Sequence, residues 1–188
     1  NWARYEGTTV PQVTLDMLEE SGRGVGRNFS PETFVGGLSH RGQQGTYAMV
    51  LNQAMPGGKT ITGRKSWFLN DDQILCLGSN ITCDEAEYPT QTTLCQKSLR
   101  ADEGGAFPPT VVDGEGCVAF PEERMLDEAS PHWFTDVQQT GYYIPAGQSV
   151  TVARKHQVSR ESWDEEDTEG DLLTAWIDHG EDPDNANY

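Results

Sequence analysis

Two strand-like runs joined by a short turn dominate the middle of this 188-residue sequence. The first run, residues 60–69, is rich in β-branched and aromatic residues, and the second, residues 73–78, is mostly apolar. The cluster Asn70-Asp71-Asp72 joins them, which is typical of a β-hairpin. Because residues 74–77 do not alternate between apolar and polar, we expect this strand to be covered on both faces, as inside a β-sandwich.

Strand-like segments of the same kind recur along the chain. They are residues 46–51, 91–95, 117–120, 141–144, 149–153 and 172–177, separated by turn-forming residues such as Asp113-Gly114 and Glu169-Gly170. Short strands with Gly, Pro and Asp between them predict an all-β fold, a large antiparallel β-sandwich with few or no helices. No linker or repeat divides residues 1–188, so we expect one domain. The one expected helix is residues 14–21, with Thr14 as its N-cap.

The charge of the chain limits its partners. Thirteen basic and 30 acidic residues give a formal net charge of −17, which argues against a nucleic-acid partner. A polyanionic ligand would need a locally basic groove. No apolar stretch approaches the roughly 20 residues of a membrane span. The acidic run 164–171 raises calcium binding as a weak alternative to a solvated loop, and otherwise we expect no cofactor.

Cysteines and sequons favour an extracellular setting. Four cysteines occur without zinc-like spacing, so we expect no metal site and a pair of disulfides. Three connectivities are open, and the predicted one is Cys83–Cys95 with Cys76–Cys117. Asn28 and Asn80 begin N-glycosylation sequons. Together these features predict a secreted, acidic glycoprotein.

The central hairpin, residues 63–81, closely resembles a signature of polysaccharide lyase family 8, the hyaluronate, chondroitin and xanthan lyases. In that signature a Lys-Ser-Trp-Phe strand, here residues 65–68, turns through Asp-Asp into a strand containing Leu-Gly-Ser, here residues 77–79. Other matching segments follow in the order of the family: Gly7-Thr8-Thr9, Phe34-Val35-Gly36-Gly37, Gln91-Thr92-Thr93, Gly141-Tyr142-Tyr143-Ile144-Pro145, Ser162-Trp163 and Ile177-Asp178-His179-Gly180. The resemblance therefore spans almost the whole chain.

The resemblance implies a role within a larger enzyme. Family members carry a helical toroid, a β super-sandwich and a smaller β domain, and this chain matches most of the super-sandwich only, as if truncated at both ends. Their chemistry is β-elimination at a uronic acid, with catalytic Asn, His, Tyr and Arg supplied by the toroid. We therefore expect no catalytic residue here and no activity from this chain alone. The family's acidic residue before a Gly-x-x-Gly strand start falls on Arg41, of opposite charge.

Five residues are candidates for contact with carbohydrate. His40, Arg41, Gln43 and Gln44 suit a sugar cleft, since guanidinium and amide groups bind carboxylates and hydroxyls, although exposed turn residues would look the same. Trp133 is a candidate for stacking on a sugar ring. The predicted function is scaffold and cleft wall of a lyase acting on uronic-acid polysaccharides, partnered by polysaccharide or by the missing domains as a second chain. The alternative is a stand-alone secreted β-sandwich that binds carbohydrate or protein without catalysis.

Overall fold

The computed structural model describes residues 5–13, 30–160 and 167–188. The described residues form three antiparallel sheets, and their only helical element is the short 3₁₀ turn Pro56–Gly58, so the predicted all-β sandwich fold is confirmed. The expected helix at residues 14–21 lies outside the described residues. Within those residues, no helix combines the length and apolar character needed to cross a membrane.

The chain divides into two compact units. One contains Asn1–Val10 and Gln91–Asp178, and the other contains Pro11–Thr90 and His179–Tyr188. The first is called unit 1 below and the second unit 2. Each unit is therefore built from two separate stretches of sequence.

Unit 1 is organised around a five-stranded sheet of order β1-β6-β13-β12-β9. Its strands, in sheet order, are β1 (Thr9–Pro11), β6 (Thr90–Ser98), β13 (Asp167–Asp178), β12 (Val150–Arg160) and β9 (Glu122–Leu126). The long hairpin of β12 and β13 is its centre, where Val150, Ala153, Leu173 and Ala175 are at most 1% exposed. Burial of these apolar side chains provides the main stabilisation of the sheet.

A four-stranded sheet of order β11-β10-β7-β8 completes unit 1. Its strands are β11 (Gly141–Ile144), β10 (His132–Thr135), β7 (Thr110–Val112) and β8 (Glu115–Cys117). Phe134 and Val112 pair across the strands and are buried, whereas Trp133 and Tyr143, one position along, are exposed. This alternation gives the sheet one inner and one outer face.

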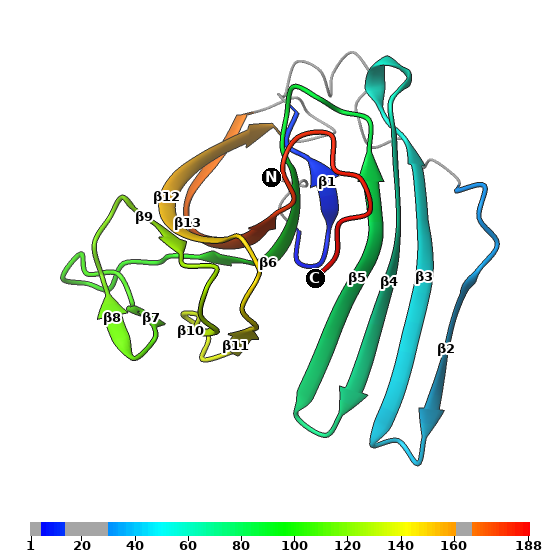
Figure 1. Ribbon diagram of the computed structural model, residues 1–188. Helices are drawn as coiled ribbons and strands as arrows, with labels where there is room; N and C mark the ends of the chain where they lie inside the picture. The colour runs from blue at the N-terminus through cyan, green and yellow to red at the C-terminus, as the bar shows by residue number, and fades with distance from the viewer. Residues whose placement is uncertain (1–4, 14–29, 161–166) are drawn as a thin grey trace. The chain divides into compact units, whose positions relative to one another are not determined.

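Unit 2 is a meander of four strands in the order β2-β3-β4-β5 (Figure 1). The strands are β2 (Val35–His40), β3 (Gln44–Ala54), β4 (Thr60–Asn70) and β5 (Gln73–Cys83), so the predicted hairpin is confirmed with its turn at Asp71-Asp72. The C-terminal segment runs along the outer edge of β5, where Gly78 exchanges backbone hydrogen bonds with Tyr188 and Ile81 with Ala186. The Tyr188 ring lies where a side chain at residue 78 would be, which explains why only glycine fits there.

One expectation about unit 2 differs from the structure. Strand residues 74–77 were expected to be covered on both faces, but Ile74, Leu75 and Leu77 are 62%, 56% and 40% exposed. The reason is that the described residues of unit 2 form a single sheet, without a second layer of their own over this end. Asn80 is exposed on β5 with a left-handed backbone (φ 53°) at a β-bulge, a conformation that asparagine tolerates well. Its glycosylation stays a prediction, and Asn28 lies outside the described residues.

The predicted disulfides are absent from the structure. All four cysteines are free thiols: Cys76, Cys83, Cys95 and Cys117. The pairing of Cys83 with Cys95 assumed one short loop between them, whereas Cys83 ends β5 in unit 2 and Cys95 lies within β6 in unit 1. Burial raises the pKa of the Cys95 thiol to about 12, so this side chain is held as an unreactive, small apolar group.

Candidate functional site

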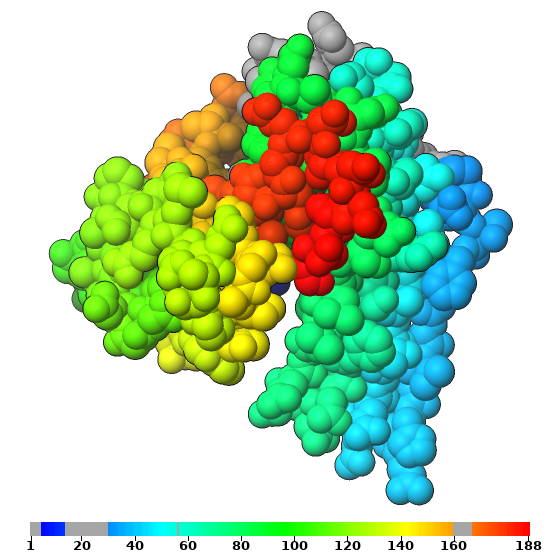
Figure 2. Space-filling model, viewed as in Figure 1, coloured from blue at the N-terminus to red at the C-terminus, as the bar shows by residue number. Residues whose placement is uncertain are grey.

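Polar side chains gather at one end of the β2–β5 sheet, where the β2–β3 and β4–β5 hairpins turn. The first turn carries His40, Arg41, Gln43 and Gln44, and the second carries Asn70, Asp71, Asp72 and Gln73. These eight residues are called the hairpin tips below. All of them are exposed, and the tips project from the end of the sheet (Figure 2).

Hydrogen bonds tie the two hairpin tips together. The Gln44 Nε2 donates to Asn70 Oδ1 at 3.0 Å, and the Asp71 backbone N–H donates to the Gln43 carbonyl at 3.3 Å. Arg41 and Asp71 both adopt left-handed backbone (φ 52° and 51°), which lets each hairpin reverse within a few residues. The two turns therefore form one continuous polar surface.

The chemistry of the hairpin tips suits recognition of a polar polymer. Amide side chains donate and accept hydrogen bonds, the Arg41 guanidinium can pair with a carboxylate through two N–H groups, and the carboxylates of Asp71 and Asp72 accept from hydroxyls. A small hollow of about 10 Å³, room for roughly one water molecule, lies in unit 1 and is lined by Thr110, Val112, Cys117, Glu122, Arg124, Val152 and Arg154. The hairpin tips are exposed and thus form an open contact surface.

The predicted candidates fall in two places. Four of them, His40, Arg41, Gln43 and Gln44, come together at the hairpin tips, as their closeness in sequence predicts. Trp133 lies on β10 of unit 1, beside Tyr143. Asn70 and Gln73 were missed as candidates, although the Asn/Asp cluster that predicts the turn was itself the signal for them.

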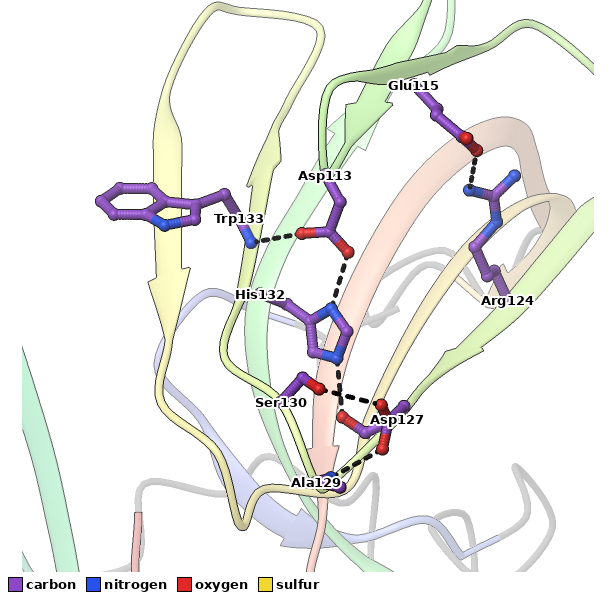
Figure 3. A network of polar contacts seen from close by, with 8 residues as sticks. All are labelled: Asp113, Glu115, Arg124, Asp127, Ala129, Ser130, His132 and Trp133. Atoms are coloured by element: carbon purple, nitrogen blue, oxygen red, sulfur yellow. Dashed lines mark hydrogen bonds and ion pairs between the residues drawn. The ribbon is translucent and has the colours of Figure 1, made fainter.

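A second polar network lies next to Trp133 (Figure 3). His132 Nδ1 is 2.7 Å from Asp113 Oδ2, and His132 Nε2 donates to the Asp127 carbonyl at 2.6 Å. The other Asp113 oxygen accepts the Trp133 backbone N–H at 2.9 Å. Both imidazole nitrogens face acceptors, so the protonated ring, which donates from both, fits this site best.

These contacts shift two pKa values in opposite directions. Hydrogen bonds to the Asp113 carboxylate and the Asp127 carbonyl raise the pKa of His132 above its usual value. The Trp133 N–H and the His132 imidazole hold the pKa of the Asp113 carboxyl below its usual value. The sequence contained no signal for this network, since Asp113 and His132 are 19 residues apart and meet only through strand pairing.

We expect the stabilisation from His132 to depend on pH. Because folding raises its pKa, the stabilisation is fully present below the unfolded value of about 6.5 and is lost as the pH rises through the folded pKa. The urea midpoints of the unaltered protein and of His132→Gln should therefore differ most at about pH 6 and converge towards about pH 9. A difference between the two urea midpoints that grew with rising pH would contradict a charged His132.

The described residues contain no group of three or more His, Cys, Asp or Glu side chains placed to hold a metal ion. His156 contacts Asp171 at 2.9 Å and Glu169 at 3.3 Å, and these bonds raise its pKa. Both partners belong to the neighbouring strand β13, so this cluster is an exposed cross-strand ion pair. Residues 164–166 of the acidic run lie outside the described residues.

The whole chain is similar to known lyases. The family model for polysaccharide lyase family 8, super-sandwich domain, matches residues 1–188. A hyaluronate lyase from Thermasporomyces composti is 30% identical over 98% of this chain and 23% of its own length. A chondroitin sulfate ABC endolyase from Proteus vulgaris is 29% identical over 100% of this chain and 18% of its own length.

A solved structure supports the same relationship. A xanthan lyase from Paenibacillus superposes with a TM-score of 0.75 at 25% identity, covering 100% of this chain and 18% of that one. The chain thus spans about a fifth of the length of the relatives that it matches.

Proposed function

Since this chain belongs to polysaccharide lyase family 8, as its super-sandwich domain, we propose that it serves a secreted lyase as scaffold and as one wall of the substrate cleft. The substrate class is an acidic polysaccharide that contains uronic acid, cleaved by β-elimination. The groups that abstract and return the proton belong to other parts of the complete protein. The hairpin tips contribute contacts to substrate and no chemical step.

The observation that carries this proposal is the meeting of the two hairpin tips. Two turns separated by 26 residues at Gln44 and Asn70 present amide, guanidinium, imidazole and carboxylate groups on one surface. An acidic polysaccharide offers hydroxyls at every sugar and a carboxylate at each uronic acid, and such side chains can hydrogen-bond to both groups. In a chain with a net charge of −17, Arg41 is the one cation of the tips that is charged at every physiological pH.

The named substrates of the relatives support the substrate class. The similar proteins are a hyaluronate lyase, a chondroitin sulfate lyase and a xanthan lyase, and all three polymers contain uronic acid. A carboxylate on every repeat of the polymer needs a positive partner to offset repulsion from the acidic chain. Arg41 can offer two parallel N–H donors to such a carboxylate.

The test is kinetic and uses the complete protein that carries this chain. We expect Arg41→Ala to raise the KM for chondroitin or hyaluronate about tenfold while kcat stays within about twofold, because the contact binds substrate and transition state alike. Turnover is followed by the ultraviolet absorbance of unsaturated sugar products. Gln53→Ala is the matched control. Gln53 lies on β3 at the end opposite Gln44, away from the hairpin tips, so this variant should leave KM unchanged.

Three outcomes would contradict the proposal. The first is an Arg41→Ala enzyme with unaltered KM on both polymers, which would remove the tips from the substrate path. The second is production of unsaturated sugars by the isolated 188-residue chain, which would place catalytic groups within it. The third is a fall in kcat with an unaltered KM, which would mean that Arg41 takes part in the chemical step.

A further inference from the structure

The outer face of the four-stranded sheet in unit 1 presents two aromatic rings to solvent. Trp133 and Tyr143 are direct cross-strand partners on β10 and β11, with ring centroids 4.7 Å apart and planes tilted by 45°. Trp133 is 60% exposed and Tyr143 is 54% exposed. Figure 3 shows the indole of Trp133 projecting away from the His132 network.

The residues in the row next to these rings have small side chains or none. On the same face, strand pairing aligns Gly116, Val111, Thr135 and Gly141 across β8, β7, β10 and β11. A side-chain carbon added at Gly116 or Gly141 would meet no atom within 4 Å, so both glycines leave open space above the sheet. The rings therefore border a flat floor on which Thr135 offers a hydroxyl.

Hydrogen bonds and ring stacking fix the backbone that carries Trp133 and Tyr143. Asp113 accepts the Trp133 backbone N–H and pairs with His132, which also donates to the Asp127 carbonyl. Beneath Tyr143, the Tyr142 ring stacks on buried Phe134 with centroids 4.3 Å apart and planes 6° apart. Rigid aromatic side chains lose little entropy when a ligand binds, and this favours recognition.

We propose that the Trp133–Tyr143 face binds a pyranose ring by stacking, as a glycan subsite separate from the hairpin tips. The occupant is the uncharged sugar residue of the acidic polysaccharide, so this inference rests on the proposed function for its polymer. The apolar C–H face of a pyranose covers an aromatic ring well, and its hydroxyls reach Thr135 at the side. The subsite would hold the polymer to the enzyme between cleavage events.

Charge and size select this occupant. The four strands of the sheet contain no Lys or Arg, and the imidazole of His132 has both nitrogens bonded to Asp113 and Asp127. A sulfate or carboxylate therefore finds no unengaged cationic partner on these strands. Arg124, on the neighbouring strand β9, is within 3.9 Å of Glu115 and of Glu122. A stable protein partner needs about 800 Å² on each side, far more than two rings expose. A single sugar ring matches both the area and the lack of charge.

The experiment separates polymer from short substrate in the complete protein. We expect Trp133→Ala to weaken binding to chondroitin about tenfold, measured by affinity electrophoresis on ice in gels containing the polymer. Turnover of a chondroitin tetrasaccharide should be unchanged, because this subsite is proposed to retain the polymer and not to position the sugars that are cleaved. Trp133→Phe keeps a ring and should bind with intermediate affinity. Met125→Ala, which removes a 76% exposed apolar side chain from β9, is the matched control.

The outcomes are distinct from those of the hairpin-tip test. Unchanged polymer binding in both Trp133 variants would overturn the subsite. An equal loss of polymer binding and of tetrasaccharide turnover would also overturn it, because Trp133 would then belong to the cleft. If Trp133→Ala fails to fold, as judged by circular dichroism, the Trp133→Phe and Tyr143→Ala variants decide the result. Electrophoresis needs no turnover, so the subsite can stand even if the lyase activity is absent.

Discussion

The Asp136→Ala variant is expected to lose about 3–5 kcal/mol of unfolding free energy, the largest effect of any substitution considered for this protein. The Asp136 side chain is 0% exposed. Its Oδ1 accepts the backbone N–H groups of Gln138 and Thr140 at 2.8 and 3.0 Å, and its Oδ2 accepts the Tyr142 hydroxyl at 3.1 Å. Alanine would leave these partly buried donors unpaired, and Lys97, 3.8 Å away, would lose a counter-charge.

A matched aspartate provides the control for this result. Asp127 makes the same kind of turn contact, to the Ala129 N–H at 2.7 Å and the Ser130 hydroxyl at 3.1 Å, but it is exposed. Water can replace Asp127, so Asp127→Ala should cost no more than about 1 kcal/mol. Urea unfolding of both variants, followed by circular dichroism, measures the difference. Equal losses would mean that burial of the carboxylate contributes nothing.

Replacement of Arg154 by Met is expected to cost about 2–4 kcal/mol. Arg154 is 1% exposed, and from β12 its Nε donates to the Ala119 carbonyl at 3.0 Å. Its Nη1 donates to the Pro108 carbonyl at 2.9 Å and the Thr110 hydroxyl at 2.7 Å. The side chain thus connects the five-stranded sheet to β7 of the four-stranded sheet. Its Nη2 has no hydrogen-bond partner among the described residues. This unpaired donor costs free energy in the folded protein, so the loss of stability on replacing Arg154 is smaller than that on replacing Asp136.

Arg124 serves as the comparison for Arg154. It lies two residues from Glu122 on β9, its side chain is 36% exposed, and its carboxylate contacts are as long as 3.9 Å. Exposed pairs of this kind are worth about 0–1 kcal/mol, so Arg124→Met should be nearly neutral. A thermal melt of each variant, at equal protein concentration, ranks them. An Arg154→Met protein as stable as Arg124→Met would show that apolar packing replaces the buried guanidinium without loss.

The strands that the sequence predicted are those with long apolar or β-branched runs. The turn at Asp71-Asp72 and strand β4 lie where expected, because local residue chemistry determines them. Strands β7 and β10 are three and four residues long and were missed, since such short segments depend on their neighbours for stability. Strand β2 was not assigned as a strand because paired glycines interrupt its apolar pattern.

Recognition of the site from sequence was partial for a similar reason. The four candidates at residues 40–44 are close in sequence, so their grouping needed no knowledge of strand pairing. The contribution of Asn70 depends on the register of β3 against β4, and the partnership of Trp133 with Tyr143 depends on that of β10 against β11. Both predicted disulfides failed because sequence separation gave no information on which unit each cysteine occupies.

The two-part composition of unit 1 sets an order on folding during synthesis. Strand β1 pairs with β6, and the Thr9 and Thr92 hydroxyls that meet there at 2.7 Å are 83 residues apart. At roughly 5–20 residues per second, the ribosome takes several seconds to deliver the partner of β1. β13, on the other side of β6, arrives after a further delay of similar length. The nascent chain must therefore keep β1 without its partner strand while unit 2 is made, and a chaperone that shields this segment would raise the yield of native protein.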